Sequence, residues 1–189
     1  MRPRERRDPA AATPSPLLRP AERDRHGALP PPSPHTAAEL AALIGLLTAP
    51  RPRIRTVVTG HSRDAASVRT AAAFTEAWEA RGGTVLTVVD WPETAASWLR
   101  AARRMTAETP DAWVIAAAGP GFVQLARRLR HSTTWEPSRT YAFGSLRDAR
   151  VTAQAGPGVL HGLRGADADG GWWEVHGDQV TTFPSRTSG

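Results

Sequence analysis

Short runs of apolar and β-branched residues alternate with segments of helical periodicity, and this alternation limits the possible fold more than any other feature. The expected strands are residues 54–59, 84–89, 113–118 and 140–143. The expected helices are residues 37–47, 65–81, 94–107 and 122–129. Strands separated by helices are typical of βαβ units, whose right-handed crossovers build a parallel sheet with helices on both faces. The sequence therefore predicts an α/β fold, a Rossmann-like three-layer parallel sheet.

The ends of this series carry local signals. Thr36 is a suitable N-cap for the first helix, and Glu39 at the third helical position completes the spacing of a capping box. Towards the C-terminus, residues 172–175 and 179–183 are strand-like runs joined by a turn-prone tripeptide. We expect a C-terminal β-hairpin there. The adjacent Trp172 and Trp173 should then face opposite sides of the sheet.

Residues 1–35 differ in composition from the rest of the chain. They hold nine of the 17 prolines and seven arginines, with little periodic apolar content. Such a segment buries too little surface to offset the entropy of ordering it. The expected organisation is a disordered tail over residues 1–35, a Rossmann-like lobe over 36–184 and a frayed end over 185–189. No signal-peptide pattern follows the first arginines, so the sequence as written predicts a cytoplasmic protein.

Composition excludes several classes of chemistry. The chain of 189 residues has no cysteine, and all 24 of its Lys+Arg residues are arginine. Disulfides, thiolate metal sites, a cysteine nucleophile, a lysine Schiff base and a P-loop lysine are therefore excluded. The six histidines lack ligand spacing, so neither a metal nor a cofactor is expected. The net charge of +6 is scattered among acidic residues, which favours a solvated surface over a nucleic-acid-binding face. No apolar run reaches the roughly 18 residues of a membrane-spanning helix.

Candidate binding groups follow three of the expected strands, in turns at residues 60–64, 118–121 and 144–147. In an open parallel sheet, ligands bind at the carboxyl ends of the strands. The candidate ligand-binding residues there are Ser62, Asp64, Gly119, Gly121 and Ser145. The N–H groups around Gly119 and Gly121 open a helix and would favour an anion.

The same residues support an enzymatic interpretation less well than a ligand-binding one, and no catalytic residue is assigned. His61, Ser62 and Asp64 lie too close in sequence to align as a triad, and helix N-capping explains Ser62 and Asp64 better. Gly119 and Gly121 form an incomplete dinucleotide fingerprint. Asp90 near the end of the second strand keeps a Rossmann-like nucleotide-binding or enzymatic domain open as an alternative.

An ordered set of motifs between residues 54 and 183 resembles a known family. The helix that contains Phe74 ends in Gly82-Gly83, and Val85 follows. Residues 110–114 read P-D-A-W-V before a strand, a glycine turn opens a helix with basic residues at its end, and residues 155–165 read A-G-P-G-V-L-H-G-L-R-G before the hairpin. In this order the motifs resemble the carboxyl-side lobe of type 1 periplasmic binding proteins. They are most similar to the branched-chain amino-acid class of ABC-transporter solute receptors.

The resemblance implies a non-enzymatic module that binds a small, amino-acid-like solute. It implies ligand contacts at Ser62, Gly119 and Ser145 with their turn neighbours, and Asp64 is the nearest charged candidate. A complete receptor of this family has two lobes, so the expected partners are a ligand and either a second lobe or a second copy of the chain. A protein–protein interaction module, using the proline-rich tail and an exposed Trp172 or Trp173, is a further alternative.

Overall fold

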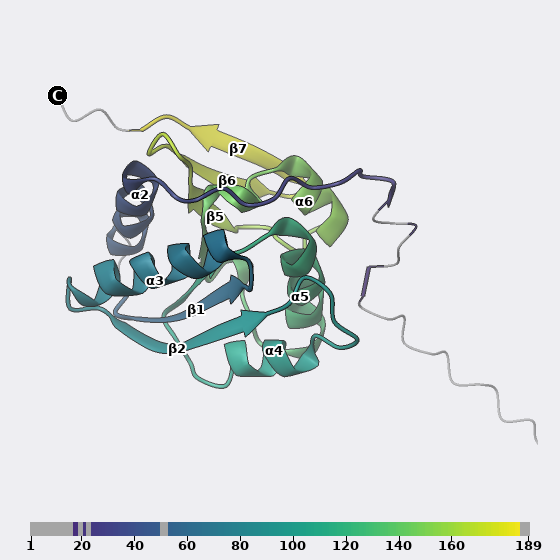
Figure 1. The fold of residues 1–189 in the computed structure, drawn as a ribbon, viewed down its shortest axis with the longest axis horizontal. Coiled ribbons are helices and arrows are strands. Elements are labelled where there is room, and N and C mark those ends of the chain that lie inside the picture. Colours follow the sequence, from purple (N-terminus) through teal and green to yellow (C-terminus); the bar gives the residue numbers. More distant parts are fainter. Residues whose placement is uncertain (1–16, 19–20, 22–23, 50–52, 186–189) are drawn as a thin grey trace, which may run out of the picture.

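The structure is a computed structural model that describes residues 17, 18, 21, 24–49 and 53–185. Its centre is a seven-stranded sheet with the order β2-β1-β3-β4-β5-β6-β7 (Figure 1). The pairs from β2 to β5 are parallel, and β6 and β7 continue the sheet antiparallel. The predicted α/β fold with a C-terminal hairpin is therefore confirmed. The strands are β1 (Thr56–Ser62), β2 (Thr84–Trp91), β3 (Ala112–Ala116), β4 (Thr140–Ala142), β5 (Arg164–Ala166), β6 (Trp172–His176) and β7 (Gln179–Phe183).

Helices cover both faces of the sheet and bury two separate apolar cores. Alternate residues of β1 divide between them, because Val57 joins one core and Val58 the other. Helices α2 and α3 close the first core and α4, α5 and α6 the second, which gives the three layers visible in Figure 1. The helices are α2 (Ala37–Thr48), α3 (Ala65–Glu79), α4 (Leu99–Met105), α5 (Gly119–Ser132) and α6 (Ala149–Ala155).

Two predicted helix starts are confirmed in detail. The Thr36 hydroxyl accepts a hydrogen bond from the Glu39 N–H at 3.0 Å, and the Glu39 carboxylate accepts from the Thr36 N–H at 3.4 Å. Asp64 caps α3 by accepting from the Ser67 N–H at 2.9 Å. Both caps satisfy N–H groups that a first helical turn leaves without an intrahelical partner.

Several boundaries differ from the prediction. The turn expected at residues 60–64 is shorter, because β1 continues to Ser62 while pairing with β2 and β3. The prediction of a turn at residues 118–121 is wrong, because Gly119 and Gly121 lie in the first turn of α5. Pro120 lies between them, at a helix start where proline is well tolerated. Helix α4 is shorter than expected, and α6 and β5 lie in the glycine-rich region where no element was predicted.

The C-terminal hairpin buries one tryptophan and half-exposes the other, as their alternation predicted. Trp173 is fully buried, and its indole N–H donates to the Ala166 carbonyl at 3.0 Å. Trp172 stacks on Phe183, with ring centroids 3.9 Å apart. Much of the exposed indole expected as a partner contact is thus covered within the hairpin itself.

Residues 27–35 were expected to belong to a disordered tail, but they make specific contacts with the lobe. The segment runs as an extended chain before α2 begins (Figure 1), and residues 30–35 share a cavity lining with residues that follow β3, β4 and β5. Most of residues 1–23 and the end at 186–189 lie outside the described residues, so those predictions stand as predictions. Within the described part of the chain, no helix has the length and apolar character needed to cross a bilayer.

Candidate functional site

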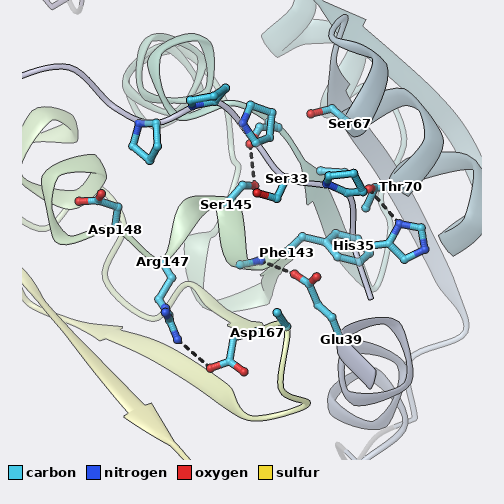
Figure 2. Close-up of a pocket in the computed structure, with 18 residues that line it drawn as sticks. Ser33, His35, Glu39, Ser67, Thr70, Phe143, Ser145, Arg147, Asp148 and Asp167 are labelled. Atoms are coloured by element: carbon cyan, nitrogen blue, oxygen red, sulfur yellow. Dashed lines mark hydrogen bonds and ion pairs between the residues drawn. The ribbon is translucent and has the colours of Figure 1, made fainter. Parts of the chain in front are cut away.

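A cavity of about 380 Å³ lies at the carboxyl edge of the sheet, beside the ends of β3 and β4. We call it the edge cavity. One flank is lined by Ser67 and Thr70 of α3, and residues 30–35 pass over the cavity (Figure 2). Its sheet side is lined by Ala116, Ala117, Phe143, Gly144, Ser145, Arg147 and Asp148. Its volume falls at the small end of the range of about 300–1,000 Å³ for ligand pockets. The position agrees with the general rule that open α/β sheets bind ligands at the carboxyl ends of their strands.

Glu39 joins helix α2 to the lining of this cavity. Its Oε1 accepts a hydrogen bond from the Gly144 N–H at 2.6 Å, while its other oxygen completes the capping box at Thr36. The residue is 6% exposed. Burial raises the pKa of the Glu39 carboxyl above its ordinary value, although the N–H groups of Gly144 and Thr36 act in the opposite direction.

Charges of both signs face the edge cavity on its other side. Arg147 forms an ion pair with Asp167 at 2.9 Å, and Figure 2 shows this pair beside the cavity. Asp148 also lines the cavity and pairs with Arg150. The Arg150 guanidinium lowers the pKa of Asp148. The cavity therefore offers carboxylates and a guanidinium within one small space.

The hydroxyl groups of the cavity are held by neighbouring groups. Ser145 donates to the carbonyl of Ala117 at 2.8 Å. The Thr70 hydroxyl lies 3.1 Å from Nδ1 of His35, whose ring packs edge-on against Phe143. No imidazole or carboxylate contacts the Ser145 hydroxyl among the described hydrogen bonds, so the geometry contains no serine–base pair there.

Of the five predicted ligand-binding residues, only Ser145 lines the edge cavity. Ser62 is fully buried. Its Oγ donates to Asp64 Oδ2 at 2.7 Å and accepts from the Ala118 N–H at 2.8 Å. Burial opposes ionisation of Asp64, but hydrogen bonds from the Ser67 N–H and the Ser62 hydroxyl outweigh it and lower the pKa. In this structure Asp64 caps α3, as it was interpreted. Ser62 ends β1 and is not an N-cap of α3, but its hydrogen bonds join Asp64 to the start of α5.

Gly119 and Gly121 also have partners within the chain. The Gly121 N–H donates to Glu93 Oε2 at 2.9 Å, so a protein carboxylate occupies the anion position expected at the start of α5. Burial raises the pKa of Glu93. Asp90, the acid of the nucleotide-binding alternative, pairs with Arg63 at 2.6 Å. A phosphate group at this helix start would meet the negative charge of Glu93, so the geometry does not favour that alternative.

Sequence reasoning missed Glu39, Asp167 and residues 30–35 as cavity residues. Glu39 has a clear local role in the capping box, which conceals its contact with Gly144 105 positions away. The prolines of residues 30–34 predicted a disordered segment, not one that lines a cavity. Among the described residues, no group of three or more His, Cys, Asp or Glu side chains is arranged to hold a metal ion.

Comparison with known proteins shows similarity at the level of the fold. No protein-family model and no curated protein sequence matches the chain. A solved structure from Rhodospirillum rubrum, assigned to branched-chain amino acid ABC transport, has a TM-score of 0.57 and 19% identity, over 68% of this chain and 36% of that one. A similarly assigned protein from Silicibacter pomeroyi has a TM-score of 0.57 and 16% identity, over 74% and 36%.

A substrate-binding periplasmic protein from Ralstonia solanacearum matches with a TM-score of 0.56 and 13% identity, over 79% of this chain and 41% of that one. The chain thus spans little more than a third of the length of the solved structures it matches. The predicted resemblance to part of an ABC-transporter solute receptor is confirmed for the fold.

Proposed function

We propose that the chain binds a small, amino-acid-like solute in the edge cavity, as a binding module rather than an enzyme. The observation that carries this proposal is a cavity of about 380 Å³ with charges of both signs, at the carboxyl edge of a sheet that shares its fold with ABC-transporter substrate-binding proteins. A cavity of this size, lined by charged and hydroxyl groups together with apolar surface, suits one small molecule.

The lining matches the chemistry of a zwitterion. The Arg147 guanidinium would bind a carboxylate of the solute, because its donors suit two-point contact with carboxylate oxygens. The carboxylates of Asp167 and Glu39 would attract an ammonium group. Phe143 and the prolines above it provide the apolar surface for a side chain.

Binding rather than catalysis is supported by the state of the polar groups. The Ser145 hydroxyl is directed to the Ala117 carbonyl, and the nearby imidazole of His35 contacts Thr70 instead. A serine nucleophile would need a base within hydrogen-bond reach of its hydroxyl. These hydroxyl and imidazole groups have partners within the protein, so the proposed contacts with a solute come from the charged side chains of the cavity.

The proposal is tested by thermal melts of the full chain with L-leucine, other L-amino acids, sugars and nucleotides. A ligand at 100 times its dissociation constant should add about 2.7 kcal/mol to the free energy of unfolding. For a chain of this size that corresponds to a rise of roughly 5–11 °C in Tm. A rise with amino acids alone supports the proposal, and a flat response to every amino acid contradicts it.

A matched pair of variants locates the site. Arg147→Gln should abolish the amino-acid-dependent rise, because it removes the cavity's guanidinium. Arg63→Gln is the control, since Arg63 also pairs with an aspartate but lies outside the cavity lining. Equal loss in both variants would show that the shift does not come from the edge cavity.

We also propose that the chain associates with a partner, either a second lobe or a second copy of itself. Either would meet the carboxyl edge of the sheet, where the cavity opens. Light scattering of the full chain with and without the amino acid tests for a second copy, and a constant monomer mass would contradict it. The cytoplasmic location expected from the sequence stays a prediction.

A further inference from the structure

Residues 27–35 form a bridge over the edge cavity, which we call the proline strap. Residues 30–35 line the cavity from the side opposite the strands, as Figure 2 shows. The strap is fixed to the lobe at both ends, and residues 30–35 line the cavity beneath it rather than fill it. Its geometry is therefore that of a cover and not of a plug that fills the site.

The amino-side end of the strap is held by helix α6. The carbonyl of Ala28 accepts a hydrogen bond from Arg150 Nη1 at 2.7 Å. The carbonyl of Gly27 accepts from the side-chain amide of Gln154 at 3.2 Å. Gln154 is buried, so its donor has a fixed position on the lobe. These bonds join segments more than 120 positions apart in sequence.

Leu29 completes this end by packing against the core. Its Cδ1 lies only 2.6 Å from the place where a Cβ on Gly119 would be, so the missing side chain of Gly119 makes the notch that Leu29 enters. Val151 forms the other wall of this notch. The contact gives Gly119, a predicted ligand residue, a different role as the seat of the strap.

The carboxyl-side end is held more firmly. His35 contacts the Thr70 hydroxyl at 3.1 Å and packs against Phe143. The next residue, Thr36, caps α2 and donates its hydroxyl to the Ala168 carbonyl at 2.7 Å. This end continues directly into a helix with a buried apolar face. The other end is held by two exposed backbone carbonyls and the half-buried Leu29, and further back by the two hydrogen bonds between Leu18 and the Gln124 side chain. The amino-side end is therefore the one that releases first.

Proline gives the span between the two ends its stiffness. Residues 30–34 include four prolines, which favour an extended conformation of about 3.1 Å per residue. Five such residues reach about 15 Å. A stiff segment loses little conformational entropy on docking and cannot collapse into the space below. It also has few N–H groups that would need partners over the cavity.

We propose that the proline strap is the lid of the edge cavity, which lets a solute in and out when Leu29 leaves its notch beside Gly119. The nature of the solute rests on the proposed function. The opening of the lid does not, because it can be measured in the empty protein.

The test uses the absence of cysteine from the chain. Ser145→Cys places a single thiol under the strap, and its reaction rate with a maleimide reports access to the cavity. Leu29→Asp should raise this rate about tenfold. The charged side chain loses the apolar burial of Leu29, and this loss should raise the equilibrium constant for opening of the strap by about a factor of ten. Arg150→Gln, which removes the donor to Ala28, should raise the rate by a smaller factor.

The matched control is Thr75→Cys, another half-buried hydroxyl position whose side chain donates to a backbone carbonyl but which lies outside the edge cavity. Its rate should not respond to Leu29→Asp or Arg150→Gln. An unchanged rate at Ser145→Cys in both strap variants would overturn the lid. An equal rise at both thiols would also overturn it, because the lobe as a whole would then have loosened.

Addition of L-leucine separates the lid from the proposed function. If L-leucine slows labelling of Ser145→Cys, and does so less in Leu29→Asp, the lid retains the solute. If labelling responds to the strap variants but no amino acid protects the thiol, the lid is supported and the amino-acid proposal is contradicted.

Discussion

Replacing Glu39 tests whether one buried carboxylate joins helix α2 to the edge cavity. Glu39→Ala removes the acceptor of the Gly144 N–H and one arm of the capping box. A hydrogen bond to a charged acceptor contributes about 1.5–3 kcal/mol. Loss of the burial cost that raises the pKa of Glu39 offsets part of this. We expect a net loss of about 2 kcal/mol, which lowers Tm by roughly 4–8 °C for a chain of this size.

Glu39→Gln should cost less, because its amide oxygen can still accept from Gly144. The difference in stability between Glu39→Gln and the wild type should also depend on pH. A carboxyl with a raised pKa destabilises the folded chain as pH rises from the ordinary value of 4.5 through the folded value. The stability of the glutamine variant relative to the wild type should therefore increase as pH rises above about 4.5, in thermal melts followed by circular dichroism.

The control for both variants is Glu76→Ala on the exposed face of α3, where the expected change is within about 0.5 kcal/mol. If Glu39→Ala lowers Tm no more than Glu76→Ala does, the carboxylate does not hold α2 to the residues around the cavity. A glutamine variant whose difference from the wild type is constant with pH would refute the argument from burial.

Two further predictions concern packing and pH. Gly165→Ala would place a Cβ 2.1 Å from the Ala142 carbonyl oxygen, and we expect a loss of about 2–3 kcal/mol in urea unfolding. Gly45→Ala, with open space at its Cβ in α2, should be neutral or stabilising, and equal losses would contradict the steric argument. Hydrogen bonds from Thr56 hold the pKa of Asp111 below its ordinary 3.8. The stability that Asp111 adds is present above that value and is lost as pH falls through the folded pKa. The Tm advantage over Asp111→Asn should therefore shrink as pH falls below about 3.8, and a constant difference in Tm would exclude this role.

The elements that the sequence predicted well are those with local causes. The Thr36–Glu39 capping box and the tryptophan-containing hairpin depend on residues within a few positions of one another. Strand β3 was predictable because it is apolar throughout, as a strand covered on both faces must be. β5 was missed because it contains Gly165, which only the close approach of β4 and Trp173 explains.

The candidate site was only partly predictable because contacts over long sequence separations build it. The rule that ligands bind at the carboxyl edge led to the region that holds the edge cavity and to Ser145, which lines it. The same rule favoured Gly121, whose N–H is taken by Glu93, a residue of the irregular stretch after β2. Nothing in the local sequence of residues 30–34 indicates that Gly119 provides a notch for the neighbouring Leu29.

The distant contacts of α2 also affect the order in which the chain can fold during synthesis. The helix is complete at Thr48, but its hydrogen-bonded partners are Gly144 and the carbonyl of Ala168 beside its cap. At about 5–20 residues per second, a ribosome needs roughly 6–24 s to make the chain between residues 48 and 168. During that time the apolar side of α2, including Leu43 and Leu47, lacks β5, the strand against which it packs most. This side of α2 should therefore stay partly uncovered until β5 has left the ribosome, and the proline strap can be held at both ends only after α6 and Ala168 have also been made.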